Sequence, residues 1–345
     1  MSAKYAASTK QVPETILAWV LYGKEDMRLE ERSTPALPVG SVLVEIGSVG
    51  VCGSDKHFYF SGQAASEVVV DPVVLGHEFG GRIVAISDGI DPGRLGQRVS
   101  VEPLVPDWSS QESRSGRYNI DPNQKFFGVP GTDGALQQYL PVPDEHAFAI
   151  PDAVSDDASA MVEPISVSLN GLRKAHIRAG SRILIAGGGP VGLFAAQLAF
   201  LHGAGEVALA EPQEYRRAAA TKIGCQVAAD IAETGGGYDA FVECSGIASV
   251  RHDGCLAVRP GGRVVFVGVG AQDALVPMPA VIEREVTIHG VMRYAFTWPS
   301  VIRMLSQGRI DADSLVSRRL AMRNALQAWT NPLPTEIKTI IRVNP

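Results

Sequence analysis

The sequence predicts an α/β protein of two domains, one rich in short β-strands and one built on a doubly wound parallel sheet. The chain has 345 residues, which suits two domains at about 100–200 residues each. The first half carries short apolar runs separated by Gly and Pro, whereas residues 166–298 alternate strand and helix patterns. This change places one domain at residues 1–165 and 299–345 and the other at residues 166–298.

The β-rich domain is expected from short apolar runs that end in turn residues. Strands alternating with clusters of turn residues predict an irregular β domain rather than a helical bundle. The runs lie at residues 41–49, 81–86, 97–101 and 135–142.

The second domain is expected from strands and helices that alternate every 10–15 residues, a pattern that predicts a parallel, doubly wound sheet. A strand at 336–343, after a helix at 321–330, is expected to return to the first domain. In chain order, the other elements expected are helix 166–174, strand 182–186, helix 190–201, strand 206–210, helix 212–223, strand 239–242, helix 248–258, strand 263–267, strand 286–289 and helix 298–307.

Composition and charge exclude several classes of function. Hydrophobic residues make up 46% and charged residues 20% of the chain, which is enough apolar material for two cores and too much for a disordered protein. The net charge of -6 argues against nucleic acid or anionic lipid as a partner. Residues 183–201 carry no charge, but their Gly and Pro residues favour a strand, a tight turn and a buried helix over a membrane span.

The cysteines and the N-terminus indicate a cytoplasmic protein. Residues 1–11 are polar and lack the apolar core of a signal peptide. The cysteines are sparse and form no Cys-x-x-Cys pair, so a reducing cytosol fits better than a disulfide framework. They are Cys52, Cys225, Cys244 and Cys255.

A glycine motif in the second domain predicts a dinucleotide site. Gly187, Gly189 and Gly192, with Pro190 and Val191 between them, follow an apolar strand and open a helix. In this Rossmann-type pattern the glycines permit a tight turn, a close approach to the pyrophosphate and close helix–strand packing. The helix N-terminus attracts the phosphates. A glycine-rich turn without a ligand, or another cofactor, is the alternative.

An acidic residue after the second strand of this domain favours NAD over NADP. Glu211 lies about twenty residues beyond the motif, where a carboxylate accepts hydrogen bonds from the ribose hydroxyls and repels a 2′-phosphate. Arg216 and Arg217 follow closely. One of them could stack on adenine or reach a phosphate, which keeps NADP as the less favoured alternative.

Three short segments of the first domain combine metal-ligand and acid–base residues. Residues 52–57 read Cys-Gly-Ser-Asp-Lys-His, residues 76–78 read Gly-His-Glu, and residues 163–164 read Glu-Pro. Alone, each has a simpler interpretation, as a small buried cysteine, a core histidine and the end of a strand.

Together with the nucleotide motif, these segments resemble the zinc-containing medium-chain alcohol dehydrogenase family, and most closely its sorbitol (polyol) dehydrogenase branch. The resemblance covers nearly the whole chain and keeps the family's order. It implies a GroES-like catalytic domain and a Rossmann-type cofactor domain. Arg293 and Tyr294, followed by Thr297, Trp298 and Pro299, are especially similar to that branch. The other segments that carry the resemblance are 51–57, 74–78, 102–103, 115–119, 126–127, 133–134, 163–167, 187–192 and 243–246.

The resemblance implies a catalytic zinc held by Cys52 and His77, with a third ligand from Glu78, or from Glu163 directly or through a water. These donors leave a fourth position for water or the substrate alcohol. If both carboxylates bound, the zinc would be a weaker Lewis acid, so one is expected to be exchangeable. Neighbours on a strand point to opposite faces, so His77 and Glu78 share a metal only if a turn after Gly76 re-aims them.

The second, structural zinc of many relatives is expected to be absent, which leaves one zinc per chain. Those relatives hold it with four cysteines in a lobe of the first domain. Here the equivalent positions, aligned on residues 115–119, are Asp107, Ser110, Ser113 and Asp121. Hydrogen bonds and packing are expected to hold the lobe instead.

The resemblance also implies a proton relay and further cofactor contacts. Ser54 would accept the proton of the substrate hydroxyl and pass it through the nicotinamide ribose to His57 and then to solvent. An imidazole titrates near neutral pH and suits this step. Asp55 is expected to orient a metal ligand. The further cofactor contacts are expected from Cys244, Val267, Gly268 and Arg293.

A polyhydroxylated alcohol is the expected substrate, oxidised to a ketose with hydride transfer to NAD. The polar partners of the substrate hydroxyls would be Glu163, which is also expected to be catalytic, Arg293 and Tyr294. A site that hydrogen-bonds hydroxyl groups rejects analogues that lack those groups. A structural salt bridge is the alternative for Arg293. The walls of the substrate site are expected from Phe58, Tyr59, Phe126 and Phe127.

Other functions stay open. The substrate could be an aldonate such as idonate, whose carboxylate would pair with Arg293, or an amino alcohol such as threonine. A zinc-free quinone reductase would lack both the metal donors and an acid at position 211, and a non-catalytic NAD(P)-binding protein would show no turnover.

The resemblance suggests a homodimer or homotetramer that associates near residues 286–290. It also suggests hinges near residues 163–167 and 293–298.

Overall fold

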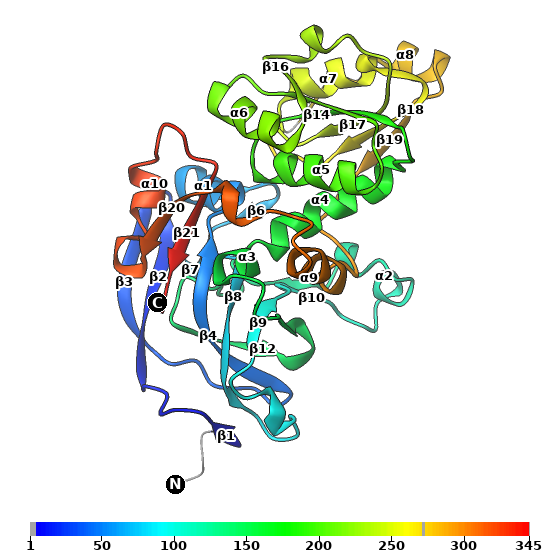
Figure 1. The fold of residues 1–345 in the computed structure, drawn as a ribbon. Helices are drawn as coiled ribbons and strands as arrows, with labels where there is room; N and C mark the ends of the chain where they lie inside the picture. Colours follow the sequence, from blue (N-terminus) through cyan, green and yellow to red (C-terminus); the bar gives the residue numbers. More distant parts are fainter. Residues whose placement is uncertain (1–4, 271–272, 345) are drawn as a thin grey trace. The chain divides into compact units, whose positions relative to one another are not determined.

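The structure is a computed structural model that describes residues 5–270 and 273–344. Internal contacts divide the chain into two units, Met1–Glu163 with Trp298–Pro345, and Pro164–Thr297. The first boundary lies two residues before the expected domain limit, and the second lies one residue before it. The expected α/β class, with a β-rich unit and a parallel-sheet unit, is confirmed (Figure 1).

The first unit is built on an eight-stranded sheet with the path β13-β9-β8-β4-β21-β20, to which β1 adds at β8 and β12 at β4. The last strand, β21, runs antiparallel to β4 and parallel to β20. The expected return of the C-terminal strand to this domain is therefore confirmed. The strands are β1 (Ala7–Ser8), β4 (Ser41–Gly50), β8 (Glu78–Ile86), β9 (Arg98–Val101), β12 (Tyr139–Pro143), β13 (Ala147–Ala149), β20 (Val316–Ala321) and β21 (Lys338–Arg342).

Smaller sheets complete the strands of this unit. The hairpin β2 (Thr15–Gly23) and β3 (Asp26–Ser33), joined by β7 (Val73–Val74), was not expected from the sequence. Its inner strand is buried at successive residues from Ala18 to Leu21, so it lacks the alternation typical of a half-exposed strand. The two-stranded ribbons are β5 (Gln63–Ala64) with β6 (Glu67–Val68), and β10 (Leu104–Val105) with β11 (Lys125–Phe126).

The helices of the first unit are short, and one expectation about them is wrong. The helix expected at 321–330 begins after Ala321, because that residue still pairs with β21, and it is broken into η6 (Met322–Asn324) and α10 (Gln327–Thr330). The other helices are α1 (Gly53–Ser61), α2 (Gln111–Arg114), α3 (Asp156–Ala160) and α9 (Trp298–Ser306), with 3₁₀ turns η1 (Pro92–Arg94), η2 (Tyr118–Ile120), η3 (Asp144–His146) and η5 (Asp313–Leu315).

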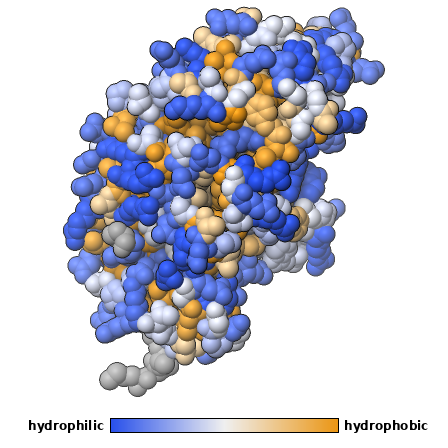
Figure 2. All heavy atoms as spheres, viewed as in Figure 1, coloured by the Kyte–Doolittle hydropathy of each residue, from blue (hydrophilic) through white to orange (hydrophobic). Residues whose placement is uncertain are grey.

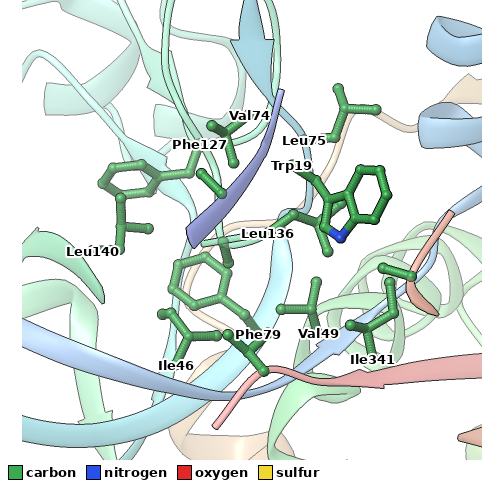
Figure 3. Close-up of a cluster of buried hydrophobic side chains, with 14 of the residues drawn as sticks. Trp19, Ile46, Val49, Val74, Leu75, Phe79, Phe127, Leu136, Leu140 and Ile341 are labelled. Carbon is green, nitrogen blue, oxygen red and sulfur yellow. The ribbon is translucent and has the colours of Figure 1, made fainter. Parts of the chain in front are cut away.

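The core of the first unit is formed by side chains from its eight-stranded sheet and from the three-stranded sheet β3-β2-β7. Figure 3 shows Trp19 of β2, Phe79 of β8 and Ile341 of β21 among the side chains of this cluster. Trp19 also donates from its Nε1 to the carbonyl of Met322 at 2.7 Å, so the hairpin and the C-terminal segment are tied together. Burial of such apolar side chains contributes about 1.5–3 kcal/mol each.

The second unit is a six-stranded parallel sheet with the order β16-β15-β14-β17-β18-β19. In chain order its strands run 3-2-1-4-5-6, the doubly wound arrangement in which ligands bind where the order reverses, outside the carboxyl ends of β14 and β17. The elements are α4 (Val162–Ala175, beginning in the first unit), β14 (Arg182–Ala186), α5 (Pro190–Leu201), β15 (Glu206–Ala210), α6 (Glu214–Ile223), β16 (Gln226–Ala228), η4 (Ile231–Thr234), β17 (Tyr238–Glu243), α7 (Ala248–Ala257), β18 (Val258–Phe266), α8 (Met278–Glu283) and β19 (Thr287–Gly290).

The surface carries polar residues with apolar ones in small groups between them, as the face in Figure 2 shows. Scattered apolar residues are normal on a protein surface. Within residues 5–270 and 273–344, no helix combines the length and apolar character needed to cross a bilayer.

Candidate active site

Three predicted metal donors lie together in the first unit. The donor atoms of Cys52, His77 and Glu78 all lie within 4.8 Å of one another. A thiolate, an imidazole and a carboxylate form a donor set that suits zinc, with metal–ligand distances of about 2.0–2.3 Å. Two ligands of one tetrahedral ion then lie about 3.3–3.8 Å apart, so small side-chain movements would bring these three onto one ion.

The position of Cys52 follows from a strand that ends in a helix. It comes two residues after β4 and is the N-cap of α1, where the positive end of the helix dipole favours a negative charge. Asp55, one turn into the helix, accepts a hydrogen bond from the backbone N–H of Cys52 at 2.9 Å. Trp329 donates from its Nε1 to the carbonyl of Asp55 at 3.3 Å. The thiol is therefore held at a capped first turn whose Asp55 is buried.

A left-handed residue brings His77 and Glu78 to the same point. Gly76 has φ +94°, a conformation that side chains other than glycine rarely adopt. A Cβ there would also lie 2.9 Å from Val49 and 3.3 Å from the backbone of Leu136. The chain turns at Gly76 before β8 begins at Glu78, and this turn overcomes the strand alternation that would separate the two side chains.

Asp55 also faces the ring of His77. The Nδ1 atom of His77 lies 3.5 Å from the Oδ1 atom of Asp55, and both residues are buried. Burial lowers the pKa of His77, but the negative charges of Asp55 and Cys52 outweigh it and hold that pKa well above its ordinary value. A carboxylate beside one ring nitrogen is the usual partner of a metal-bound histidine, because it fixes the tautomer and leaves the other nitrogen for the metal.

Sequence reasoning missed Lys338, the cation at the centre of this cluster. Its Nζ donates to the Oε2 atom of Glu78 and to the carbonyl of Val51, the latter at 3.0 Å. Both side chains of the ion pair are only 2% exposed. Burial lowers the pKa of Lys338, but the charges of Glu78, Cys52 and Glu163 raise it above its ordinary value. The sequence signal that could have revealed this residue is a lysine at the start of the otherwise apolar C-terminal strand.

Glu163 is buried but is not one of the three grouped donors. It lies in the first turn of α4 and acts electrostatically on Lys338 and on Glu102. Glu102 is a second residue that the sequence did not single out as functional. Burial raises its pKa to about 7, although Tyr118 donates a hydrogen bond to it at 2.6 Å and the charge of Glu163 raises it further.

The two predicted relay residues lie on α1, and the predicted aromatic walls are packed. Ser54 is half-buried and His57 is exposed. Phe126 packs against the ring of His77, with centroids 5.5 Å apart. Phe58, Tyr59 and Phe127 belong to the hydrophobic core. Among the four predicted walls, Phe126 is therefore the one with a direct contact to a metal donor.

The lobe of residues 107–123 is held by a hydrogen-bond network at the positions where relatives carry cysteines. Asp121 accepts from the backbone N–H groups of Asp107 and, at 3.0 Å, of Asn123. Asn123 in turn donates to the Oδ2 atom of Asp107 at 3.0 Å. Ser110 caps α2 by accepting from the N–H of Ser113 at 3.1 Å. Polar side chains thus tie the segments of this lobe together, in line with the expectation that hydrogen bonds hold it.

In the second unit, the glycine motif lies at the carboxyl end of β14. Gly187 has φ +102° and an added Cβ would lie 3.0 Å from the backbone of Cys244, which follows β17. A Cβ at Gly192 would collide with the carbonyl of Gly187. Gly189 is the N-cap of α5 and has open space around it, while Pro190 is the first helical residue, with Val191 next. The first N–H groups of a helix have no partner within the helix, so this helix start is suited to receive a phosphate.

Glu211 lies directly after β15, beside the motif. Its carboxylate accepts from the N–H of Gly188 at 2.7 Å and from the N–H of Gln213 at 2.9 Å. Arg216 lies 3.7 Å from it and packs over the ring of Tyr215. The acid is therefore fixed where a ribose would lie in a nucleotide site of this fold.

Glu243, at the end of β17, lies in a segment that carries the resemblance but was given no role from the sequence, and it holds the next loops. Its carboxylate accepts from the N–H of Gly246 at 2.6 Å and from Arg251 at 3.3 Å. Its carbonyl accepts from the N–H groups of Val267 and Gly268 at 2.9 and 3.0 Å. Two of the predicted cofactor residues are thereby fixed in place.

Arg293 and Tyr294 lie in the loop after β19. Arg293 has φ +47°, and its carbonyl accepts from Asn170 of α4 at 2.9 Å. Tyr294 is fully buried. Their predicted contacts with substrate or cofactor stay predictions.

Known proteins resemble the chain over nearly its whole length. Residues 38–152 match the alcohol dehydrogenase GroES-like domain, and residues 190–307 match the zinc-binding dehydrogenase model. Sorbitol dehydrogenase of Gallus gallus is 33% identical over 343 residues, which is 95% of this chain and 97% of the relative. That of Bacillus subtilis (strain 168) is 32% identical over 337 residues, 94% of this chain and 96% of the relative. The structure of a zinc-binding dehydrogenase from Sinorhizobium meliloti 1021 bound to NADP has a TM-score of 0.89 at 27% identity, covering 96% of this chain and 100% of that one.

Replacing Lys338 tests the charge balance of the metal donors. Lys338→Met leaves the buried carboxylate of Glu78 without its cation, which destabilises the metal-free protein by about 3–5 kcal/mol. The zinc-loaded protein is expected to lose less, because the ion supplies the missing positive charge. Denaturant unfolding with and without zinc measures both losses.

The matched control is Lys10→Met, which removes an ion pair with Glu45 whose lysine is 42% exposed. Such a pair contributes at most about 1 kcal/mol. Equal losses in the metal-free and zinc-loaded forms of Lys338→Met, or an equal loss in Lys10→Met, would contradict the prediction.

Glu102→Gln tests the buried carboxyl group. Its pKa of about 7 in the folded chain exceeds its ordinary value of 4.5, so the folded state keeps the proton when the unfolded state has lost it. This contribution to stability is complete below pH 4.5 and is lost as pH rises to about 7. The wild type should therefore lose stability relative to Glu102→Gln across this range, as unfolding at several pH values measures.

Glu206→Gln is the control with the opposite sign. The hydrogen bond from Arg182 lowers the pKa of Glu206 below 4.5, so its contribution is lost only as pH falls below that value. A constant difference between wild type and Glu102→Gln from pH 4.5 to 7 would show that Glu102 is ionised throughout.

Proposed function

The chain belongs to the zinc-dependent medium-chain alcohol dehydrogenases, near their sorbitol dehydrogenase branch, and from this premise we propose that it oxidises a secondary alcohol of a polyol such as sorbitol or xylitol to the ketose, with NAD as hydride acceptor. It is an NAD(P)-dependent oxidoreductase of small alcohols. The observation that carries the finer proposal is the grouping of Cys52, His77 and Glu78 in a chain whose curated relatives are named sorbitol dehydrogenases.

The metal ligands in this proposal are Cys52, His77 and Glu78, with Glu163 acting through a water. The grouping of the first three donors and the position of Glu163 outside it favour this order over direct binding by Glu163. A bound zinc supplies a Lewis acid that lowers the pKa of the substrate hydroxyl. Lys338 offsets one carboxylate charge, so that the donor set does not weaken that acidity.

The proton of the substrate hydroxyl leaves through α1 in this proposal. Ser54 accepts it, and His57, which is exposed on the same helix, delivers it to solvent. Asp55 takes no part in the relay, because it is buried and engaged with the N–H of Cys52 and the ring of His77. It keeps those two ligands in position.

One zinc per chain is proposed, since the lobe positions are Asp107, Ser110, Ser113 and Asp121. Hydrogen bonds of these side chains support an organisation without a second ion. Assembly as a homodimer or homotetramer through the edge strand β19 is proposed on the resemblance alone. An aldonate or amino alcohol is the alternative substrate class.

The test of the proposed function is a joint measurement of metal content and substrate range. Elemental analysis is expected to find about one zinc per chain. Reduction of NAD should be fastest with sorbitol, xylitol or galactitol, slower with threonine and idonate, and least with ethanol, and a chelator should abolish it. Turnover with only idonate or threonine would replace the substrate class. Protein that takes up no zinc and prefers NADP would overturn the assignment.

Glu211→Gln tests the preference for NAD. The substitution keeps the shape that receives the N–H of Gly188 but removes the charge. Loss of a hydrogen bond to a charged group weakens NAD use about tenfold, and loss of the repulsion toward a 2′-phosphate improves NADP use. The ratio of kcat/KM for the two cofactors measures the shift.

Glu214→Gln is the control, because Glu214 is an exposed acid in the first turn of α6. It removes the same charge near the same strand end. If it shifts the cofactor ratio as much as Glu211→Gln does, then Glu211 is not the residue that discriminates.

A further inference from the structure

An open groove of the first unit combines cations with the size of a small-molecule site. Its volume is about 640 Å³, within the 300–1,000 Å³ or so of typical ligand pockets. Of the described residues that line it, none is a metal donor, and several are apolar. Its polar lining residues are Gln138, Arg319, Arg323, Asn324 and Arg342.

Three arginines line the groove, two from neighbouring strands and one from the turn that follows the first of these strands. Arg319 lies on β20 and Arg342 on β21, which pair in parallel, with Ala321 opposite Arg342. Figure 1 shows these two strands side by side near the C-terminus. Arg323 follows in η6, directly after β20. The topology thus gathers guanidinium groups from two separate segments of the chain.

One buried carboxylate orients two of these guanidiniums. Asp157 of α3 is 1% exposed, and it accepts from the Nε of Arg319 at 2.7 Å and pairs with Arg342 at 2.9 Å. The two arginine side chains are 49% and 33% exposed. Asp157 therefore holds them from the buried side and leaves part of each guanidinium toward solvent.

The carboxylates near the groove leave one of its cations unbalanced. Asp152, Asp156 and Asp157 are shared among Arg98, Arg319 and Arg342. The side chain of Arg323 has no hydrogen bond or ion pair with any described residue and is exposed. The surplus positive charge of Arg323 thus lies beside two oriented guanidinium groups at the groove, an arrangement whose repulsion a bound anion would relieve.

We propose that this groove binds a small dianion, a phosphate ester or a dicarboxylate, through Arg319, Arg323 and Arg342. Guanidinium groups form paired hydrogen bonds with both kinds of oxyanion, and here two of them are pre-oriented by Asp157. The apolar lining accommodates the carbon part of such a molecule. Binding there does not depend on the polyol chemistry proposed above, because no metal donor contributes to the groove.

The test is calorimetric titration of the zinc-loaded full chain with inorganic phosphate and, separately, with succinate. One saturable site per chain is expected for at least one probe. Arg323→Gln should weaken it about tenfold, the effect of one charged hydrogen bond. Arg323→Gln is the cleaner variant, because Arg319→Gln also removes a partner of buried Asp157. Binding of phosphate alone identifies a phosphate site, and binding of succinate alone identifies a carboxylate site.

Arg309→Gln is the control, since Arg309 is an exposed arginine of the same unit that does not line the groove. It should leave the dissociation constant unchanged. The proposal is overturned if neither probe saturates, if Arg323→Gln binds as tightly as the wild type, or if Arg309→Gln weakens binding equally, which would indicate general surface charge.

Discussion

The first unit depends on keeping the ammonium group of Lys338 charged inside its core. A buried cation is tolerated only with an anion and hydrogen bonds around it, and here Glu78 and the carbonyl of Val51 provide them. This requirement fixes β21 beside β4. It also explains Gly50, where an added Cβ would collide with the Glu78 carboxylate and the Lys338 side chain. The metal donors are therefore positioned by the end of the chain as much as by their own loops.

The second unit solves a different problem, which is to hold strand-end loops open for a ligand without losing their shape. Two acids do this. Glu211 receives the N–H of Gly188, and Glu243 receives the N–H of Gly246. Each carboxylate satisfies backbone donors that no strand or helix pairs, which would otherwise be costly where they are buried. The start of α5, with the positive end of its dipole, is suited to a phosphate.

The sequence predicted the second unit better than the first because its signals are local. A strand, a glycine turn and a helix are contiguous, so α5 and β15 have the predicted limits. In the first unit the hairpin of β2 and β3 was missed because β2 is buried on both faces. The helix expected at 321–330 was placed one residue too early, because Ala321 still pairs with β21, and it is broken into η6 and α10. At Ala321 the pairing between β20 and β21 overrides the local preference for a helix, and no local sequence pattern encodes that pairing.

The residues of the candidate site also fall into two groups, those with a local sequence signal and those without one. Cys52, His77 and Glu78 could be chosen from short motifs together with the family resemblance, but the turn at Gly76 that brings the last two together came from the structure. Lys338 could not be chosen in this way, because its partner Glu78 lies 260 residues away. A lysine in an apolar strand normally indicates an edge with its ammonium in water; only the inserted position of β21 makes it a buried counter-ion. The donors' chemistry can thus be read from the sequence, but the charge that balances them depends on the topology.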